Sequence, residues 1–140
     1  MTGPASTDLV ALTRRTYDLA RAGDWDALLD MYRPDIVWDM SPAGLGIYEG
    51  PAAIRAFFEE WTGSYEEYEI VPEEILDLGG GVVFVAVVQN GRPAGSSGRV
   101  QLRYGSVVVW VDGGASRITN YTDVDEARAA AERLAESTGS

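Results

Sequence analysis

The 140-residue chain contains no cysteine and no histidine. Without cysteine it can form no disulfide, thiolate nucleophile or zinc–sulfur site. For the same reason the sequence does not indicate whether the protein works in an oxidising or a reducing compartment. Without histidine it has no Ser-His or Cys-His nucleophilic system and lacks the commonest transition-metal ligand. Any acid–base chemistry must therefore come from carboxylates, tyrosines or basic side chains with a shifted pKa. We predict neither a metal nor a cofactor.

Positive charge is also scarce: the chain has 11 basic and 22 acidic residues, which gives a net charge of −11. Nucleic acids and anionic membranes are bound through patches of basic side chains, so we expect neither as a partner. Such an acidic surface is typical of a soluble bacterial protein that repels copies of itself.

Long hydrophobic runs are missing as well. The longest is 82–88, far shorter than the roughly 20 residues that cross a bilayer. The N-terminus, MTGPASTDL, has no basic segment followed by an apolar one, so no secretory signal is visible. We therefore expect a cytoplasmic protein.

Apolar residues are nevertheless abundant, at 46% with four Trp and seven Tyr, which supports a real hydrophobic core. The length fits one domain. We place that domain at residues 8–136, between a disordered tail at 1–7 and a second tail at 137–140.

Three segments in the first half carry apolar residues at helical spacing. Gly23 can end the first of them, Asp24 can cap the second, Pro34 stops the second, and Pro51 opens the third. Their apolar faces are Leu9, Leu12, Thr16 and Leu19; Trp25, Leu28, Leu29 and Tyr32; and Ile54, Phe57, Phe58 and Trp61.

The rest of the chain alternates as strands do. A strand at 36–40 follows the second helix, and strands at 68–78, with a bulge at Pro72, 82–89, 99–111 and 116–121 follow the third. We expect 90–98 to be a mobile loop, and Asp123 with Glu126 to open a last helix through a capping box. This order predicts an α+β fold: a bent antiparallel sheet packed on three helices around a conical pocket, with an extra C-terminal helix.

Two stretches, GDWDALLDMY…DIVW…YEGPAAIRAFF.EW and RYGSVVVWVDGGASRITNYTDVDEARAAA, resemble the SnoaL-like branch of the nuclear transport factor 2-like superfamily. The resemblance covers about residues 8–136. That superfamily includes ketosteroid isomerase, limonene epoxide hydrolase and polyketide cyclases. The resemblance implies the fold more firmly than any activity, because this fold hosts unrelated chemistries.

The catalytic residues of those relatives are replaced here. The resemblance places the Asp base of ketosteroid isomerase at Met40, its tyrosine at Thr16 and its protonated acid at Val107. None of these side chains can do that work. The Asp-Arg-Asp set of the epoxide hydrolase falls, by the same resemblance, at about Gln89, Val87 and Asn120.

The strand at 36–40 decides whether a carboxylate reaches the pocket. Ile36, Trp38 and Met40 make the better core face, which turns Asp39 outward. A shift by one residue would turn Asp39 inward, where burial would raise its pKa and make it a candidate catalytic base.

We expect the pocket to be lined by large apolar residues, with neutral amides and phenols as its polar groups. The alternatives are that the aromatic residues are plain core, that the two amides bind each other or water, and that Arg103 is solvated at the mouth. The expected set is Tyr17, Tyr32, Trp38, Met40, Phe58, Trp61, Gln89, Arg103, Val107 and Asn120, together with Val109.

Leu102, Tyr104, Val108 and Trp110 should form the outer face of the long strand, which we interpret as a homodimer surface. Three functions fit this picture. The first is binding of a small apolar molecule with one or two hydrogen-bonding groups. The second is an isomerase, cyclase or hydrolase-type enzyme that uses Asp39 or a pocket tyrosine as acid or base. The third is a module whose sheet face recruits a partner and whose pocket is closed by side chains.

Overall fold

The computed structural model describes residues 8–63 and 65–138 of the chain. Its helices are α1 (Leu9–Ala22), α2 (Trp25–Leu29), α3 (Pro51–Gly63) and α4 (Val124–Thr138), with a short 3-10 turn, η2, at Ser41–Ala43. Within this part of the chain, no helix is long and apolar enough to cross a membrane. The predicted tail at 1–7 lies outside the described residues, whereas α4 extends into the predicted tail at 137–140.

The strands form one six-stranded sheet in the order β2-β1-β6-β5-β4-β3. All neighbouring strands are antiparallel except β1 and β6, which pair in parallel. The predicted α+β class is confirmed, with one parallel pair in a sheet that we expected to be antiparallel throughout. The strands are β1 (Tyr32–Asp39), β2 (Ile47–Glu49), β3 (Tyr65–Gly79), β4 (Val82–Pro93), β5 (Val100–Val111) and β6 (Gly114–Tyr121).

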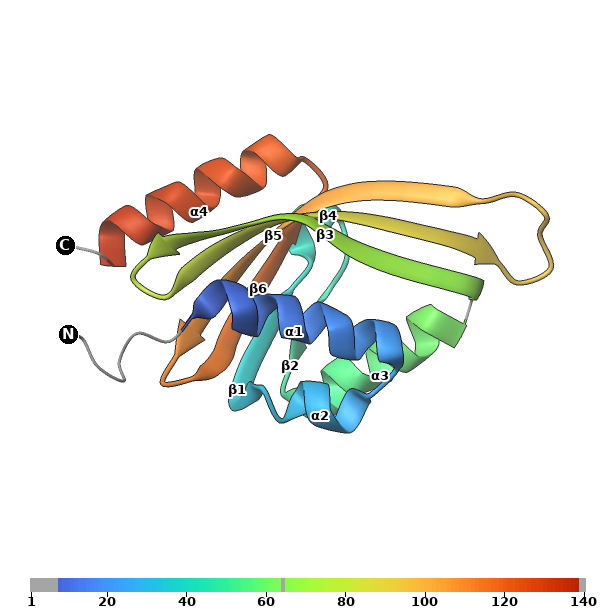
Figure 1. The fold of residues 1–140 in the computed structure, drawn as a ribbon, viewed down its shortest axis with the longest axis horizontal. Helices are drawn as coiled ribbons and strands as arrows, with labels where there is room; N and C mark the ends of the chain where they lie inside the picture. The colour runs from blue at the N-terminus through green and yellow to red at the C-terminus, as the bar shows by residue number, and fades with distance from the viewer. Residues whose placement is uncertain (1–7, 64, 139–140) are drawn as a thin grey trace.

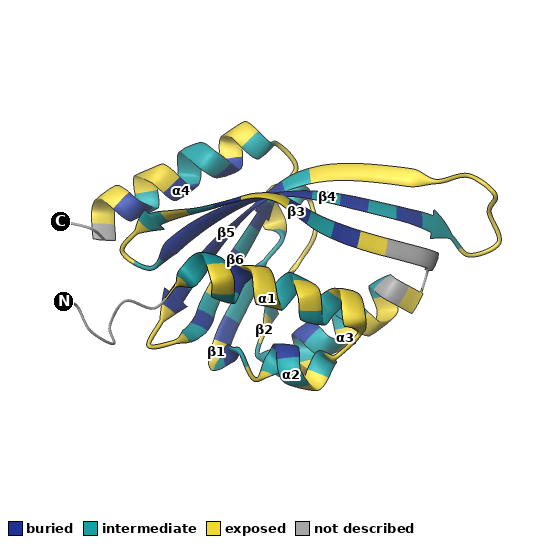
Figure 2. Ribbon diagram, in the orientation of Figure 1, coloured by how far each residue is buried: buried dark blue, intermediate teal, exposed yellow. Residues whose placement is uncertain are grey.

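The sheet separates two layers of helices. Figure 1 shows α1, α2 and α3 together on one face and α4 on the other. The strands are most buried where helices cover them, while the far end of β5, beyond the helices, is exposed (Figure 2). We call the face under α1–α3 the inner face and the face under α4 the outer face.

Three predicted capping residues are confirmed. Gly23 adopts φ 71°, a left-handed conformation that glycine enters without steric cost, and its N–H closes α1. Asp24 caps α2 by accepting from the backbone N–H of Ala27. Asp123 caps α4, since its carboxylate accepts from the N–H groups of Asp125 and Glu126.

Two boundaries differ from the prediction. The second helix ends at Leu29, and Tyr32 starts β1 instead of completing a helical stripe. Tyr32 pairs with Ala115 of β6, and Pro34 keeps Arg33 out of helical geometry, so the chain is extended from Tyr32 onward. The predicted loop at 90–98 is shorter, because β4 runs on to Pro93 and pairs with β5, where Gln101 Nε2 donates to Asn90 Oδ1 at 3.0 Å.

The two faces of β5 are the reverse of what we predicted. Val108 and Trp110 are about 5% exposed and face the inner layer, so they cannot form the predicted homodimer surface. Val107 packs on the outer face with Phe84 and the alanines of α4. Both faces of this strand are apolar, so alternation alone did not tell them apart.

Helix α4 therefore covers the apolar outer face from within the same chain. Its alanines, Ala127, Ala131 and Ala135, are 0%, 0% and 9% exposed. Gly105 of β5 lies directly beneath them, and a Cβ there would stand 2.3 Å from the Cβ of Ala127. This glycine lets the helix approach the strand closely.

Candidate functional site

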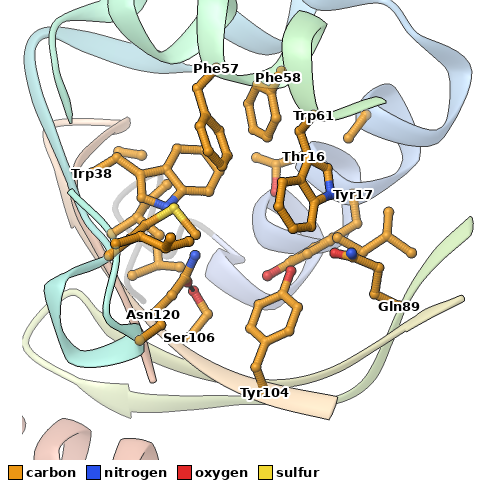
Figure 3. Close-up of a pocket in the computed structure, with 18 of the residues that line it drawn as sticks. Thr16, Tyr17, Trp38, Phe57, Phe58, Trp61, Gln89, Tyr104, Ser106 and Asn120 are labelled. Atoms are coloured by element: carbon orange, nitrogen blue, oxygen red, sulfur yellow. Dashed lines mark hydrogen bonds between the residues drawn. The ribbon is translucent and has the colours of Figure 1, made fainter. Parts of the chain in front are cut away.

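A cavity of about 340 Å³ lies between the inner face and the helices α1, α2 and α3. It is at the small end of the range typical of small-molecule sites. Side chains from β1, β4, β5 and β6 form one wall, and α1 and α3 form the other (Figure 3). Its lining is overwhelmingly apolar.

The sheet wall contains one row of three polar or amphipathic side chains. Trp38 of β1 pairs with Ile118 of β6, and Asn120 lies two residues further along the same face of β6. Asn120 stands opposite Ser106 of β5, whose Oγ donates to Asn120 Oδ1 at 2.7 Å. Ser106 and Asn120 are 1% and 4% exposed, so this bond is fully buried.

The helical wall is aromatic. Phe58 of α3 packs edge-on against Trp38, with ring centroids 4.7 Å apart, and stacks on Trp25 at 5.1 Å. Phe57 stacks on Trp61 at 5.8 Å. Such pairs add about 0.5–1.5 kcal/mol each beyond the area that they bury, so they hold the wall in place.

Two phenols line the cavity, and a threonine hydroxyl outside the lining satisfies one tryptophan of the wall. Tyr17 and Tyr32 both line the cavity. Burial raises the pKa of Tyr32 far above its usual value, and the nearby Tyr17 adds to this, so the phenol stays protonated and cannot act as a base. Thr13 Oγ1 accepts from Trp110 Nε1 at 3.1 Å, which satisfies that indole.

The mouth is marked by lining residues that are also exposed. Leu45, just after the η2 turn, is 45% exposed, and Leu102 of β5 is 43% exposed. Arg103 lines the same rim, but its guanidinium is ion-paired with the carboxylate of Glu73 and largely faces solvent. The cavity thus opens between this turn and β5.

Trp38 has an unusual feature. Its Nε1 is buried and has no hydrogen-bond partner, and it is the one such side-chain atom among the described residues. Leaving a buried donor unsatisfied costs about 1–3 kcal/mol. An unpaired group of this kind in a cavity wall calls for an explanation.

Asp39 lies away from this cavity. It lines a separate hollow on the outer face with Arg117, near α4. Its carboxylate accepts from the N–H and the Oγ of Ser41, at 2.9 and 2.6 Å, and from Arg117 at 2.9 Å. The bonds from Ser41, with a smaller contribution from Arg117, lower the pKa of Asp39. The alternative of an inward Asp39 with a raised pKa is wrong.

Most of the predicted lining residues do lie in the wall. Tyr17, Tyr32, Trp38, Met40, Phe58, Trp61, Gln89 and Asn120 line the cavity, and Arg103 is at its rim. Val107 and Val109 do not, because they line the outer hollow.

The residues that the sequence analysis missed come from the reversed faces of β5. Tyr104, Ser106, Val108 and Trp110 line the cavity in place of Val107 and Val109. The sequence alone held no signal for this, because only the pairing of Ser106 with the inward Asn120 shows that the even-numbered residues of β5 face inward.

The described lining includes no Asp or Glu, and its one charged side chain is Arg103. Neutral donors and acceptors remain: the indole of Trp38, the amides of Asn120 and Gln89, and the hydroxyls of serine, threonine and tyrosine. Such a wall can bind and orient a neutral molecule, and it offers no carboxylate to remove a proton. In the parts of the chain described, no group of three or more metal-binding side chains occurs.

The family model described as a SnoaL-like domain matches residues 13–121, well over half of the chain. No curated protein sequence matches.

Solved structures share the fold. TerC, co-crystallized with polyporic acid, is similar with a TM-score of 0.70 and 21% identity, covering 89% of this chain and 97% of its own. A putative polyketide cyclase from Xanthomonas campestris pv. campestris has a TM-score of 0.66 and 25% identity, covering 86% and 94%. SalBIII is an epoxide hydrolase/cyclase-like enzyme with a role in pyran ring formation in polyether salinomycin. It has a TM-score of 0.68 and 21% identity, covering 79% of this chain and 87% of its own.

Proposed function

This chain belongs to the SnoaL-like domain family, and we propose that its inner cavity binds a small, neutral, mostly apolar molecule. The observation that carries this proposal is a preformed apolar cavity of about 340 Å³ with neutral polar groups in its wall. Cavities of this kind are the usual small-molecule sites of proteins. The third function, a module with a closed pocket, is disfavoured by the same cavity.

The comparisons support this proposal without naming the ligand. TerC, which shares the fold, was co-crystallized with a small organic acid, polyporic acid. A charged ligand is less suited to the present cavity. Burying a carboxylate without a paired cation is costly, and the single cation of the lining, Arg103, is held at the rim by Glu73.

A catalytic role is the second candidate, because the putative polyketide cyclase and SalBIII share the fold. In this chain such a role would fall to Tyr17 or Tyr32 as a hydrogen-bond donor. Opening of a neutral epoxide, such as styrene oxide, tests it by diol formation. If the wild type forms the diol and Tyr17→Phe or Tyr32→Phe abolishes this turnover, the catalytic role is favoured. If diol formation equals the uncatalysed rate, binding alone is favoured.

The binding proposal is tested with N-phenyl-1-naphthylamine, a neutral apolar dye that fluoresces in dry surroundings. We expect saturable binding at micromolar concentration. Ala20 of α1 lines the cavity, so Ala20→Phe should fill it and weaken binding at least tenfold. Ala11, exposed on the same helix, provides the matched control Ala11→Phe, which should bind as the wild type does.

Two results would count against the proposal. One is the absence of saturable dye binding by the folded wild type. The other is equal dye affinity in Ala20→Phe and Ala11→Phe, which would place the dye elsewhere on the surface.

A further inference from the structure

We propose that Trp38 and Asn120 form a binding site for a carbonyl oxygen, and that the ligand is a flat aromatic ketone or quinone. This inference rests on the proposed binding function and adds to it the group that is recognised. Its basis is a pair of N–H donors at one end of the cavity, surrounded by aromatic rings.

Strand register brings the two donors together. β1 and β6 run in parallel, Trp38 pairs with Ile118, and Asn120 follows two residues later on the same face. Side chains placed in this way on adjacent strands are diagonal neighbours. Figure 3 shows the nitrogens of Trp38 and Asn120 at the same end of the cavity.

Both nitrogens are donors for which the fold supplies no acceptor, and because Trp38 Nε1 is closed to solvent, a carbonyl oxygen reaches it when a neighbouring side chain moves aside. Trp38 Nε1 is buried and unpartnered, and an indole nitrogen can only donate. Asn120 Oδ1 accepts the hydroxyl of Ser106, which fixes the amide so that its oxygen is used and its NH₂ group faces the cavity. A carbonyl oxygen has two lone pairs and can accept from both groups at once.

The surroundings define the rest of the ligand. The rings of Trp38, Phe57 and Phe58 lie within 4.7–6.5 Å of one another by their centroids. Tyr104 faces them across the cavity from β5 (Figure 3). Rings on both sides of a narrow space favour a flat aromatic molecule, which can stack on them or meet them edge-on.

The acceptor is expected to be a neutral carbonyl and not a carboxylate. The described side chains around Trp38 and Asn120 carry no positive charge, since Arg103 is at the rim in an ion pair with Glu73. Two neutral donors satisfy a ketone well, but they leave a buried carboxylate without its counter-charge.

A matched ligand series tests this site in the intact protein. Fluorenone carries one carbonyl, fluorene has nearly the same shape without it, and fluorene-9-carboxylate carries a charge. Affinities are measured by quenching of tryptophan fluorescence and by calorimetry. We expect wild type to bind fluorenone roughly 3- to 10-fold more tightly than fluorene, as one or two net hydrogen bonds would give, and to bind the carboxylate most weakly.

Two variants remove the donors. Trp38→Phe keeps an aromatic ring, and Asn120→Leu combined with Ser106→Ala removes the amide without leaving the buried hydroxyl unpaired. Each should bring fluorenone affinity close to that of fluorene while fluorene affinity changes little. Trp61→Phe is the control, and it should keep the preference for fluorenone.

The infrared stretching frequency of the carbonyl group of bound fluorenone provides a test that needs no variant. In wild type the stretching frequency should lie below its value in a hydrocarbon solvent, because hydrogen bonds from two N–H groups weaken the C=O bond. A hydrocarbon-like stretch, or equal affinity for fluorenone and fluorene, would overturn this inference and leave the binding function standing. Failure of both neutral ligands to bind would overturn the two together.

Discussion

The inner and outer faces of the sheet are built from the same strands, but the helices pack on them differently. On the outer face, Phe84 and Val107 are buried against the small side chains of α4, such as Ala127, and Val107 also borders the hollow beside Asp39. On the inner face, large rings such as Trp38 and Phe58 hold the helices off the sheet and leave a cavity of about 340 Å³.

The difference lies in side-chain size and in the placement of polar groups. Alanines above Gly105 let α4 approach β5 closely, so the outer face is tightly packed around this glycine. The inner face instead contains an unpaired indole N–H and a buried serine–asparagine pair. Packing on the outer face stabilises the fold. The unpaired indole on the inner face costs free energy, and a ligand that accepts its hydrogen bond would recover it.

Truncation of a ring on each face gives the largest contrast. Phe84→Ala on the outer face should cost about 3–5 kcal/mol, because it opens a void in packed surroundings. Phe57→Ala on the inner face should cost only about 1–2 kcal/mol, since it enlarges an existing cavity. Urea unfolding measures both free energies, and equal losses would contradict the distinction between the faces.

Gly105→Ala comes next in size. The added methyl group overlaps the Cβ of Ala127, so α4 must move, at a cost of about 1–3 kcal/mol. Gly98→Ala in the β4–β5 connection is the control, since its nearest neighbour is the Ser96 hydroxyl at 3.7 Å, and it should change stability by less than about 0.5 kcal/mol. If Gly105→Ala unfolds like the wild type, close packing of α4 is not what this glycine provides.

Particular residues show how far the sequence could predict this molecule. The α+β class, the glycine end of α1, the Asp123 cap and the inward Trp38 follow from local rules of helix capping and alternation. The faces of β5 do not, because Val107 to Trp110 are apolar on both sides and only pairing with β6 separates them.

The unpaired nitrogen of Trp38 could not be predicted either. A sequence shows that an indole is present, but its missing partner depends on the packing of three strands and a helix. The parallel pairing of β1 with β6, which places Asn120 beside Trp38, likewise depends on a long-range connection.

The smallest expected effect concerns Asp39 on the outer face. Its lowered pKa means that the carboxylate adds stability above its unfolded pKa of about 3.8, and that this is lost as pH falls through the lower folded value. Asp39→Asn should cost roughly 1 kcal/mol at pH 7, less near pH 3, and leave ligand affinity unchanged. Urea unfolding at both pH values checks the first part. A loss of fluorenone binding in this variant would contradict the assignment of Asp39 to the outer face.

The most direct test of the central claim, that the inner cavity is a ligand site with Trp38 as a donor, is the indole region of a ¹H–¹⁵N correlation spectrum during titration with fluorenone. Trp25, whose ring does not line the cavity, serves as the internal reference. We expect the Trp38 indole proton to move downfield on binding while the Trp25 signal stays nearly fixed. A Trp38 signal that does not move at saturating fluorenone would contradict it.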